Sequence, residues 1–274
     1  MGDKMEKFDL HTHSNQSDGT LPPGEVVAVA KKAGVSLMAL TDHDSIQGVA
    51  AAVKAGEKLG VQVVPGLEMD TEFSIELHML GLGIDPGNAA LLAFMEENAL
   101  RRQARNQAIL AQLEKTGIHL PTSSVKSRGT VTRLHVALAL VAGGYAQSVA
   151  GAFETYLRAG KAGYVHSNRI EPEAAISLIH EAGGIAVLAH PCKLACDVHA
   201  LVYRLAVAGL DGIEAFYPVA TPGQRARDLS LAEQYGLLVS CGSDFHGANR
   251  PVVPGSAWEN HPALAPIYDR LNSL

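Results

Sequence analysis

Side chains that bind metal ions recur along this chain, and most of them follow a short apolar run. They are six histidines, two aspartates and one glutamate: His11, His13, Asp18, His43, Glu68, His78, His190, Asp244 and His246. One structural ion needs about four ligands, so nine ligands in one place would form a multinuclear site, which is typical of catalysis. A fold that brings the ends of these apolar runs together would therefore build a pocket for more than one metal ion.

Short apolar runs alternate with helix-like segments over most of the chain. The apolar runs predict strands at residues 7–10, 35–40, 61–64, 67–73, 75–82, 185–189, 212–215 and 237–241. The segments between them predict helices at residues 23–33, 45–59, 172–182, 198–208 and 221–235, and Ser45 is the expected N-cap of the second helix. This alternation favours an α/β fold with a parallel sheet or barrel inside and helices outside.

Almost every candidate ligand stands at the C-terminal end of a predicted strand. His11 and His13 lie two apart in an extended segment, so their imidazoles face the same way. In β/α barrels the functional groups lie at the C-terminal ends of the strands, and one face of one barrel would collect the ligands. His78 is the exception, because it lies within a predicted strand and has to point inward.

The segment from residue 86 to 164 interrupts the alternation with helical patterns at 88–115 and 131–156. We expect a helical cap here, which divides the chain into barrel residues 1–85, cap residues 86–164 and barrel residues 165–274. Between residues 100 and 163 nine Lys or Arg and two Glu give a net charge of +7, whereas the whole chain carries −6. A basic cap over an acidic barrel suits a substrate with several phosphates.

Composition limits the class of protein. Hydrophobic residues make up 47% of the chain, which is enough for a sizeable core. The net charge of −6 argues against a protein that coats nucleic acid, and we expect no stable binding of duplex DNA. The sequence contains no signal-peptide pattern and no long uncharged apolar stretch, so we expect no membrane segment. Three cysteines without a paired motif predict a reducing, cytoplasmic setting.

The donor set suggests which ions would bind. Histidine and carboxylate ligands without cysteine suit Mn²⁺, with Zn²⁺ or Fe²⁺ as alternatives. Glu68 and Asp244 offer carboxylates that can bridge two ions. Asp42 is expected to orient a ligating imidazole, and Asp44 to cap the following helix.

Cationic residues of the cap are candidates for binding a second phosphate. Arg101 and Arg105 are four residues apart on a predicted helix and would share a face, with Arg102 beside it. Arg133 and His135 lie near the start of another helix, where backbone amides and an arginine can hold an anion. A solvated helix surface remains the alternative for these five residues.

These motifs resemble those of the PHP (polymerase and histidinol phosphatase) superfamily. The matching residues are His11-Thr12-His13, Asp18, Thr41-Asp42-His43, Glu68, His78, Ala189-His190-Pro191 and Gly242-Ser243-Asp244-Phe245-His246. The resemblance implies a distorted (β/α)7 barrel with three ions. It would place one ion on His11, His13, Glu68 and Asp244, a second on Glu68, His78 and His190, and a third on Asp18, His43 and His246.

The cap is similar to that of one PHP subgroup, the bacterial phosphatases of 3′,5′-nucleotide bisphosphates, some of which also trim short RNA from its 5′ end. The similarity rests on Thr132-Arg133-Leu134-His135 and on residues 156–161, although members more often have Pro at the position of Leu134. The resemblance implies a metal-dependent phosphatase that releases the 3′-phosphate, with two or three divalent ions, preferably Mn²⁺, and with Glu68, Asp244 and His246 as catalytic residues.

Three alternatives stay open at this point. The first is another PHP enzyme with the same ligands, such as a histidinol-phosphate phosphatase or an amidohydrolase. The second is a nucleic-acid-binding proofreading module of a polymerase. The third is a metal-binding scaffold without activity. The +7 charge of the cap segment counts against the first alternative, the net charge of −6 against the second, and the complete set of nine ligands against the third.

Overall fold

The computed structural model describes residues 5–73, 75–125, 128–166 and 168–274, so Lys126, which belongs to the basic residues of the cap, lies outside the described residues. Within these ranges seven strands form one sheet in the order β1 to β7. They are β1 Phe8–Asp9, β2 Leu37–Leu40, β3 Gln62–Thr71, β4 Leu77–Leu82, β5 Ile185–Leu188, β6 Gly212–Phe216 and β7 Leu238–Cys241.

The sheet closes on itself almost completely. Beyond β1 and β7 the two edges meet through hydrogen bonds from Leu10 N to Cys241 O (3.0 Å) and from Asp244 N to His11 O (2.9 Å). Buried Asp9 also accepts from Ser243 N and Oγ and so ties the two ends of the chain together. The predicted α/β barrel is therefore confirmed, and its closure brings the first and last ligand motifs into contact.

β4 runs opposite to its two neighbours, β3 and β5, whereas the other strand pairs are parallel. The start of β4 consequently lies at the same edge as the ends of the other strands. His78 pairs with Asp70 in the register of β3 and β4. This explains how a histidine within a strand joins ligands that follow strands.

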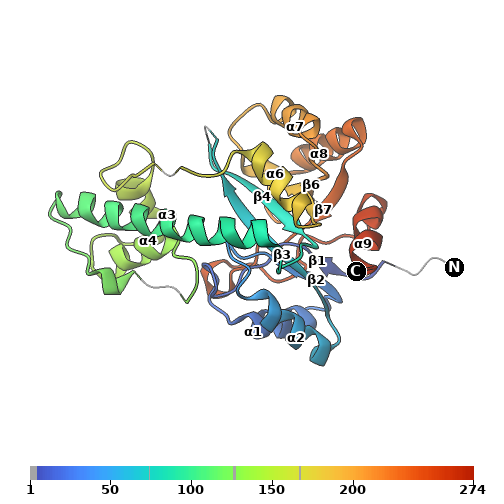
Figure 1. Ribbon diagram of the computed structural model, residues 1–274, viewed down its shortest axis with the longest axis horizontal. Coiled ribbons are helices and arrows are strands. Elements are labelled where there is room, and N and C mark those ends of the chain that lie inside the picture. The colour runs from blue at the N-terminus through green and yellow to red at the C-terminus, as the bar shows by residue number, and fades with distance from the viewer. Residues whose placement is uncertain (1–4, 74, 126–127, 167) are drawn as a thin grey trace.

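Helices cover the outside of the barrel (Figure 1). They are α1 Pro23–Lys32, α2 Val49–Leu59, α6 Pro172–Glu181, α7 Val198–Val207, α8 Pro222–Tyr235 and α9 Ala265–Asn272. Three details differ from the sequence prediction. α2 begins after Gly48, so Ser45 is not its N-cap; β3 is a single strand that runs through Pro65; and α9 was not predicted. Among the described residues no helix is both long and apolar enough to cross a membrane.

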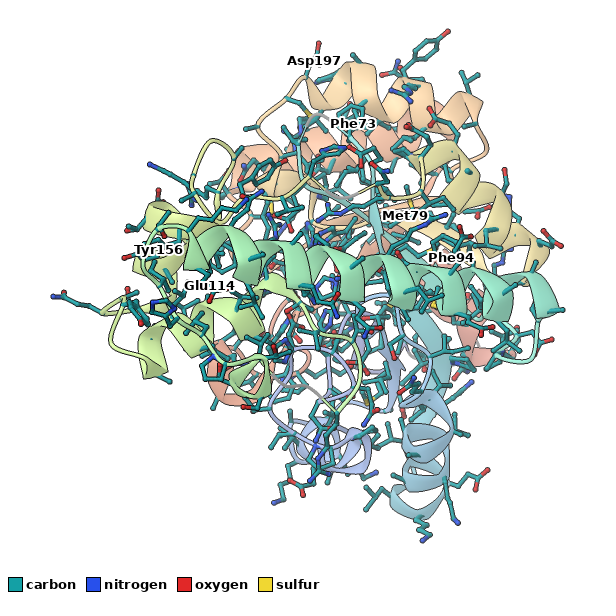
Figure 2. The ribbon with its side chains drawn as sticks, turned by 60° about the vertical axis from the view of Figure 1, so that its left-hand side comes forward. Phe73, Met79, Phe94, Glu114, Tyr156 and Asp197 are labelled. Atoms are coloured by element: carbon teal, nitrogen blue, oxygen red, sulfur yellow. The ribbon has the colours of Figure 1, made fainter. Side chains whose placement is uncertain are left out.

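The segment predicted as a cap is helical. It contains α3 Ala89–Glu114, α4 Arg133–Ala142, α5 Val149–Ala152 and a π-helical turn at Phe153–Leu157. These elements pack around a hydrophobic cluster of their own, separate from the barrel core, that includes Ile109, Leu113 and Leu140. Figure 2 shows how α3 joins the two regions, because Phe94 lies at its barrel end and Glu114 lies beside Tyr156 at its cap end.

Candidate metal centre and cation wall

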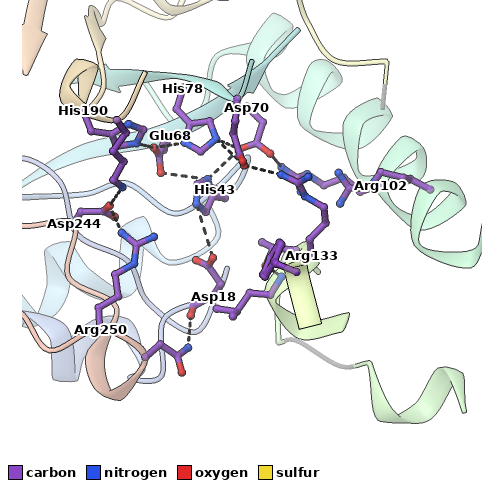
Figure 3. Close-up of a pocket in the computed structure, with 17 residues that line it drawn as sticks. Asp18, His43, Glu68, Asp70, His78, Arg102, Arg133, His190, Asp244 and Arg250 are labelled. Carbon is purple, nitrogen blue, oxygen red and sulfur yellow. Dashed lines mark hydrogen bonds and ion pairs between the residues drawn. The ribbon is translucent and has the colours of Figure 1, made fainter. Parts of the chain in front are cut away.

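The fold gathers the nine predicted ligands at one mouth of the barrel, and each is at least 92% buried. Donor atoms of several groups of side chains lie within 4.8 Å of one another. The groups are His13, Asp18, His43 and His246; His11, His190 and Asp244; His11, His13 and Glu68; His43, Asp70 and His78; and Glu68, His78 and His190. Figure 3 shows Glu68 between His78 and His190, with His43 and Asp18 below it.

The turns that follow two strands hold two of the predicted ligands in an unusual backbone conformation. His190, after β5, has φ of 32°, and Asp244, after β7, has φ of 55°. Side chains other than glycine rarely adopt positive φ, and the cost is tolerated most often at functional sites. Both residues are therefore held in place by their surroundings.

The buried donor atoms of this cluster fit divalent ions. Among the described residues the following atoms have no hydrogen-bond partner: His11 Nε2, His13 Nδ1 and Nε2, His43 Nδ1, Glu68 Oε2, Asp70 Oδ1, His78 Nε2, His190 Nδ1 and His246 Nε2. Buried polar atoms without partners are costly. Imidazole nitrogens and carboxylate oxygens are the donors that Mn²⁺, Fe²⁺ and Zn²⁺ accept, so ions would satisfy these atoms.

Electrostatics support this interpretation. Burial lowers the pKa of His43 and His78, but nearby carboxylates, led by Glu68, outweigh it and raise these pKa values to about 9 and about 10. Burial also opposes ionisation of Glu68 and Asp244, yet adjacent histidines hold the pKa of each carboxyl well below its usual range. The carboxylates are thus ionised and need cations, and metal ions can replace the protons of the histidines.

Glu214 orients the ligands and was missed in the sequence analysis. Its Oε1 lies 3.0 Å from His11 Nδ1, which turns His11 Nε2 toward the cluster, and its Oε2 accepts from His190 N at 2.7 Å. A carboxylate behind a ligating histidine fixes the tautomer and the direction of the ring. A signal was present, because an acidic residue inside the apolar run of β6 needs a buried partner.

Asp42 was expected to orient a ligating imidazole, but the structure gives it a different role. Its carboxylate accepts hydrogen bonds from Ser14 N (2.8 Å), Ser14 Oγ (2.6 Å) and Ser17 Oγ (2.6 Å), so it fixes the loop after His13 rather than an imidazole. Asp44 also differs from expectation. It does not cap the next helix, since α2 begins only at Val49, and it accepts from Arg102 instead.

Asp70 is a candidate ligand that the sequence analysis did not include. It lies two residues after Glu68 on β3, and its Oδ1 is 3.1 Å from His43 Nδ1. The missed signal is the spacing of two, which puts both carboxylates on the inner face of one strand. Arg102 holds Asp70 from the cap side, with Nη2 at 2.8 Å from Oδ2.

Asp244 is surrounded by further polar side chains that were not predicted. Lys193 Nζ lies 2.9 Å from Asp244 Oδ2, the Tyr217 hydroxyl donates to the same oxygen at 2.5 Å, and Arg250 forms an ion pair with it. Lys193 and Arg250 also line the cavity at the mouth. They follow the motif histidines His190 and His246 by three and four residues, which is the signal that was overlooked.

The five predicted phosphate-binding residues do not all reach this cavity. Arg102, Arg105 and Arg133 line it, whereas Arg101 and His135 are not among the described residues that do. Arg101 pairs with Glu97 on the exposed side of α3. We expected Arg101 and Arg105 to share the face of α3 that binds phosphate. In the structure Arg102 and Arg105, which are three residues apart, face the cavity instead. His135 Nδ1 accepts from Thr132 N (3.0 Å) and caps α4.

Arg105 is the most distinctive of these cations. It is only 6% exposed, its Nε has no hydrogen-bond partner, and no carboxylate among the described residues lies in ion-pair contact with it. Burial, followed by the charge of Arg102, lowers the pKa of Arg105 to about 9. Its Nη2 makes one long hydrogen bond, to Asn106 Oδ1 at 3.4 Å, which supplies no negative charge. A buried cation without a countercharge is strongly unfavourable, so the cavity is prepared for an anion at this position.

One cavity of about 390 Å³ contacts both features, the metal cluster on the barrel side and the arginines on the cap side. Its volume suits a small ligand. Figure 3 shows Arg102 and Arg133 on one side and Asp244 and Arg250 on the other. An anionic ligand of moderate size could therefore touch metal ions at one end and Arg105 and Arg133 at the other.

Comparison with known proteins identifies relatives over nearly the whole chain. The PHP domain model matches residues 9–157. A 5′-3′ exoribonuclease from Haemophilus influenzae is 36% identical, over 97% of this chain and 99% of its own. A 3′,5′-nucleoside bisphosphate phosphatase from Chromobacterium violaceum is 35% identical, over 98% of both. The solved structure of an amidohydrolase from Chromobacterium violaceum, with bound sulfate and no metal, has a TM-score of 0.89 at 33% identity, covering 97% of this chain and 96% of that one.

Proposed function

Since this chain belongs to the PHP domain family, we propose that it is a metal-dependent phosphatase that removes the 3′-phosphate from nucleoside 3′,5′-bisphosphates. Water adds to the phosphorus atom and the bond between phosphorus and the 3′-oxygen breaks, so adenosine 3′,5′-bisphosphate yields AMP and inorganic phosphate. The similarity to a 3′,5′-nucleoside bisphosphate phosphatase supports this substrate class.

The observation that carries the proposal is buried Arg105, on the cap side of the cavity opposite the metal cluster, which has no carboxylate in ion-pair contact among the described residues and whose Nε has no hydrogen-bond partner. A phosphate monoester held at the metals would leave this cation without a counterion. A second phosphate on the same molecule would satisfy it and would also position the first, since binding energy from a remote group can hold the reacting one in place. Arg133 lines the same cavity and would bind the 5′-phosphate together with Arg105.

The predicted ligands and Asp70 would hold the metal ions. Divalent ions would be held by the nine predicted ligands and Asp70, and they would supply Lewis-acid chemistry that polarises the phosphoryl group and acidifies an attacking water. Glu68 belongs to two of the ligand groups and Asp244 to one, so Glu68 is the carboxylate that ions held by both of its groups would have in common. Burial and the nearby His13 lower the pKa of His246 to about 4, which favours the neutral imidazole that binds metal ions, and its Nε2 lies 3.1 Å from Oδ1 of Asp18, another predicted ligand.

Short RNA with a 5′-phosphate fits the same arrangement. Its first nucleotide carries a 5′-phosphate and a phosphorus atom on the 3′-oxygen, so hydrolysis of the same bond would release one mononucleotide at a time. The similarity to a 5′-3′ exoribonuclease supports this second substrate. Histidinol phosphate is a poorer candidate, because its ammonium group would face Arg105 and Arg133.

Product release is the direct test, measured as inorganic phosphate from the phosphate monoesters and as mononucleotide from RNA. The protein would be incubated with Mn²⁺, Zn²⁺ or Fe²⁺ and with adenosine 3′,5′-bisphosphate, 3′-AMP, 5′-AMP, histidinol phosphate or a short 5′-phosphorylated RNA. We expect the bisphosphate to be preferred, with AMP as the product and Mn²⁺ as the best ion. Equal rates on all monoesters, or activity on histidinol phosphate alone, would contradict the role proposed for the arginines.

A further inference from the structure

A second cavity of about 860 Å³ adjoins the one at the metal cluster. We call it the outer cavity. The two cavities share Glu76, Arg105 and Arg133 in their linings, so these three residues stand at the boundary between them. The outer cavity extends away from the metal ligands, between the hairpin of β3 and β4 and the segment that follows the π-helical turn of the cap.

The outer cavity has two arginines beyond those that the proposed 5′-phosphate would contact. Arg158, His166 and Arg169 line it in addition to the shared arginines. Glu72 also lines it and lies 3.5 Å from His166 Nε2, and Arg169 is 3.5 Å from Asp70. Among the described residues Arg158 forms an ion pair with Glu154 alone, at 2.9 Å, and both side chains are largely exposed. An exposed pair of this kind is weak, which leaves Arg158 available to a ligand.

We propose that the outer cavity binds a second anionic group attached to the 5′-phosphate, so that the protein also acts on 3′-phosphonucleotides with a 5′-diphosphate or a 5′-phosphosulfate. This inference rests on the proposed function. A 5′-phosphate between Arg105 and Arg133 would stand at the boundary of the two cavities, and a substituent on it would enter the outer one. The reaction stays the same, because water still displaces the nucleotide at the 3′-phosphate and the 5′-anhydride remains intact.

The test compares two substrates that differ only on the 5′ side, adenosine 3′,5′-bisphosphate and 3′-phosphoadenosine 5′-phosphosulfate. We expect both to release inorganic phosphate from the 3′ position. Arg158→Glu should lower kcat/KM for the phosphosulfate about tenfold, the scale of one lost charged contact, and should change it for the bisphosphate much less. Lys161→Glu is the matched control, because it makes the same charge change three residues away and Lys161 is not among the described residues that line either cavity.

A binding measurement separates this inference from the proposed function. Calorimetry on the protein without added metal would compare ADP with AMP, which differ by one phosphate on the 5′ side. Tighter binding of ADP that Arg158→Glu abolishes would support the outer cavity, even if the bisphosphate were not hydrolysed. If the bisphosphate is hydrolysed but the phosphosulfate is rejected and ADP binds no tighter than AMP, the inference is wrong and the proposed function stands. An equal loss on both substrates in Arg158→Glu would also overturn it, since the cavity would then hold a part common to both.

Discussion

Two regions use buried charge in opposite ways: the barrel mouth, which holds the nine predicted ligands, and the cap wall, formed by the cavity-lining residues Arg102, Arg105 and Arg133. At the mouth, ionised carboxylates such as Glu68 lie among histidines, some of them with raised pKa values, and each charge has neighbours of opposite sign. On the wall, Arg105 is also buried, but no carboxylate among the described residues is in ion-pair contact with it and its Nε has no hydrogen-bond partner. The first region is built to exchange protons for metal ions, whereas the second is complete only when an anion binds. A ligand with two phosphates would connect them.

The largest effect should come from the centre of the mouth. Glu68→Gln removes a carboxylate that belongs to two of the ligand groups, and we expect activity to fall on the order of 10³-fold, the scale seen when a key group that stabilises charge is removed. Bound metal, measured by elemental analysis, should fall as well. If the variant keeps its full metal content and activity, the mouth does not act as a metal centre.

Wild-type protein treated with a chelator provides the matching comparison, because ions that bind only the folded state stabilise it. Its melting temperature should drop and should recover with added Mn²⁺. The Glu68→Gln variant should show a smaller recovery.

The mouth could be predicted from the sequence because the position of a residue at a strand end is determined by the backbone. His11, His13, His190 and His246 follow strands whose ends must meet once the barrel closes, whatever the details of packing. His78 was harder to place, since its location depends on β4 running antiparallel to its neighbours, and no local pattern reports strand direction.

Substitutions of two arginines on α3 test whether the cap wall binds an anion. Arg105→Met should lower kcat/KM for the bisphosphate roughly 10- to 100-fold, as expected for a hydrogen-bonded charge, with little change for a simple monoester such as 3′-AMP. Arg101→Met is the control, because Arg101 lies on the exposed side of α3 and should leave both rates within about twofold.

Stability should move in the opposite direction from activity. Removal of a buried cation without a partner relieves an unfavourable charge, so the unliganded Arg105→Met protein should melt at the same or a higher temperature than the wild type. A clear loss of stability would mean that Arg105 has a structural partner and that the cavity does not await an anion.

The wall was predicted less well because a helix face depends on its exact phase. Arg101, Arg102 and Arg105 all lie within two turns of α3, and the sequence pattern favoured the i, i+4 pair over the i, i+3 pair that faces inward. Asp44 and Asp70, which bind Arg102, come from the barrel. Their meeting with α3 is a tertiary contact that no segment of the sequence specifies alone.

A substitution of Glu214 tests whether metal binding at the mouth depends on a residue that orients a predicted ligand without binding the ion itself. Glu214→Gln keeps the size of the side chain but removes the charge that orients His11. We expect a 10- to 100-fold loss of metal affinity, measured by titration of the metal-free protein, with a parallel loss of activity at low metal that excess Mn²⁺ restores. Loss of activity that added metal does not restore would point to a direct role in the reaction.

The smallest effect should come from the N-cap of α4, which helps to position Arg133 on the cap wall. Thr132 caps α4 and accepts from Leu134 N, directly before Arg133, so Thr132→Ala should weaken the helix start by about 1 kcal/mol. Because Arg133 would then be less well held, the KM for the bisphosphate should rise by roughly the fivefold that this energy allows, while metal content stays unchanged. Ser148→Ala, which removes the equivalent cap of α5 away from the cavity, should cost similar stability without the change in KM. If both variants raise KM equally, the effect comes from a general weakening of the helical segment 86–164, and the position of Arg133 carries no specific role.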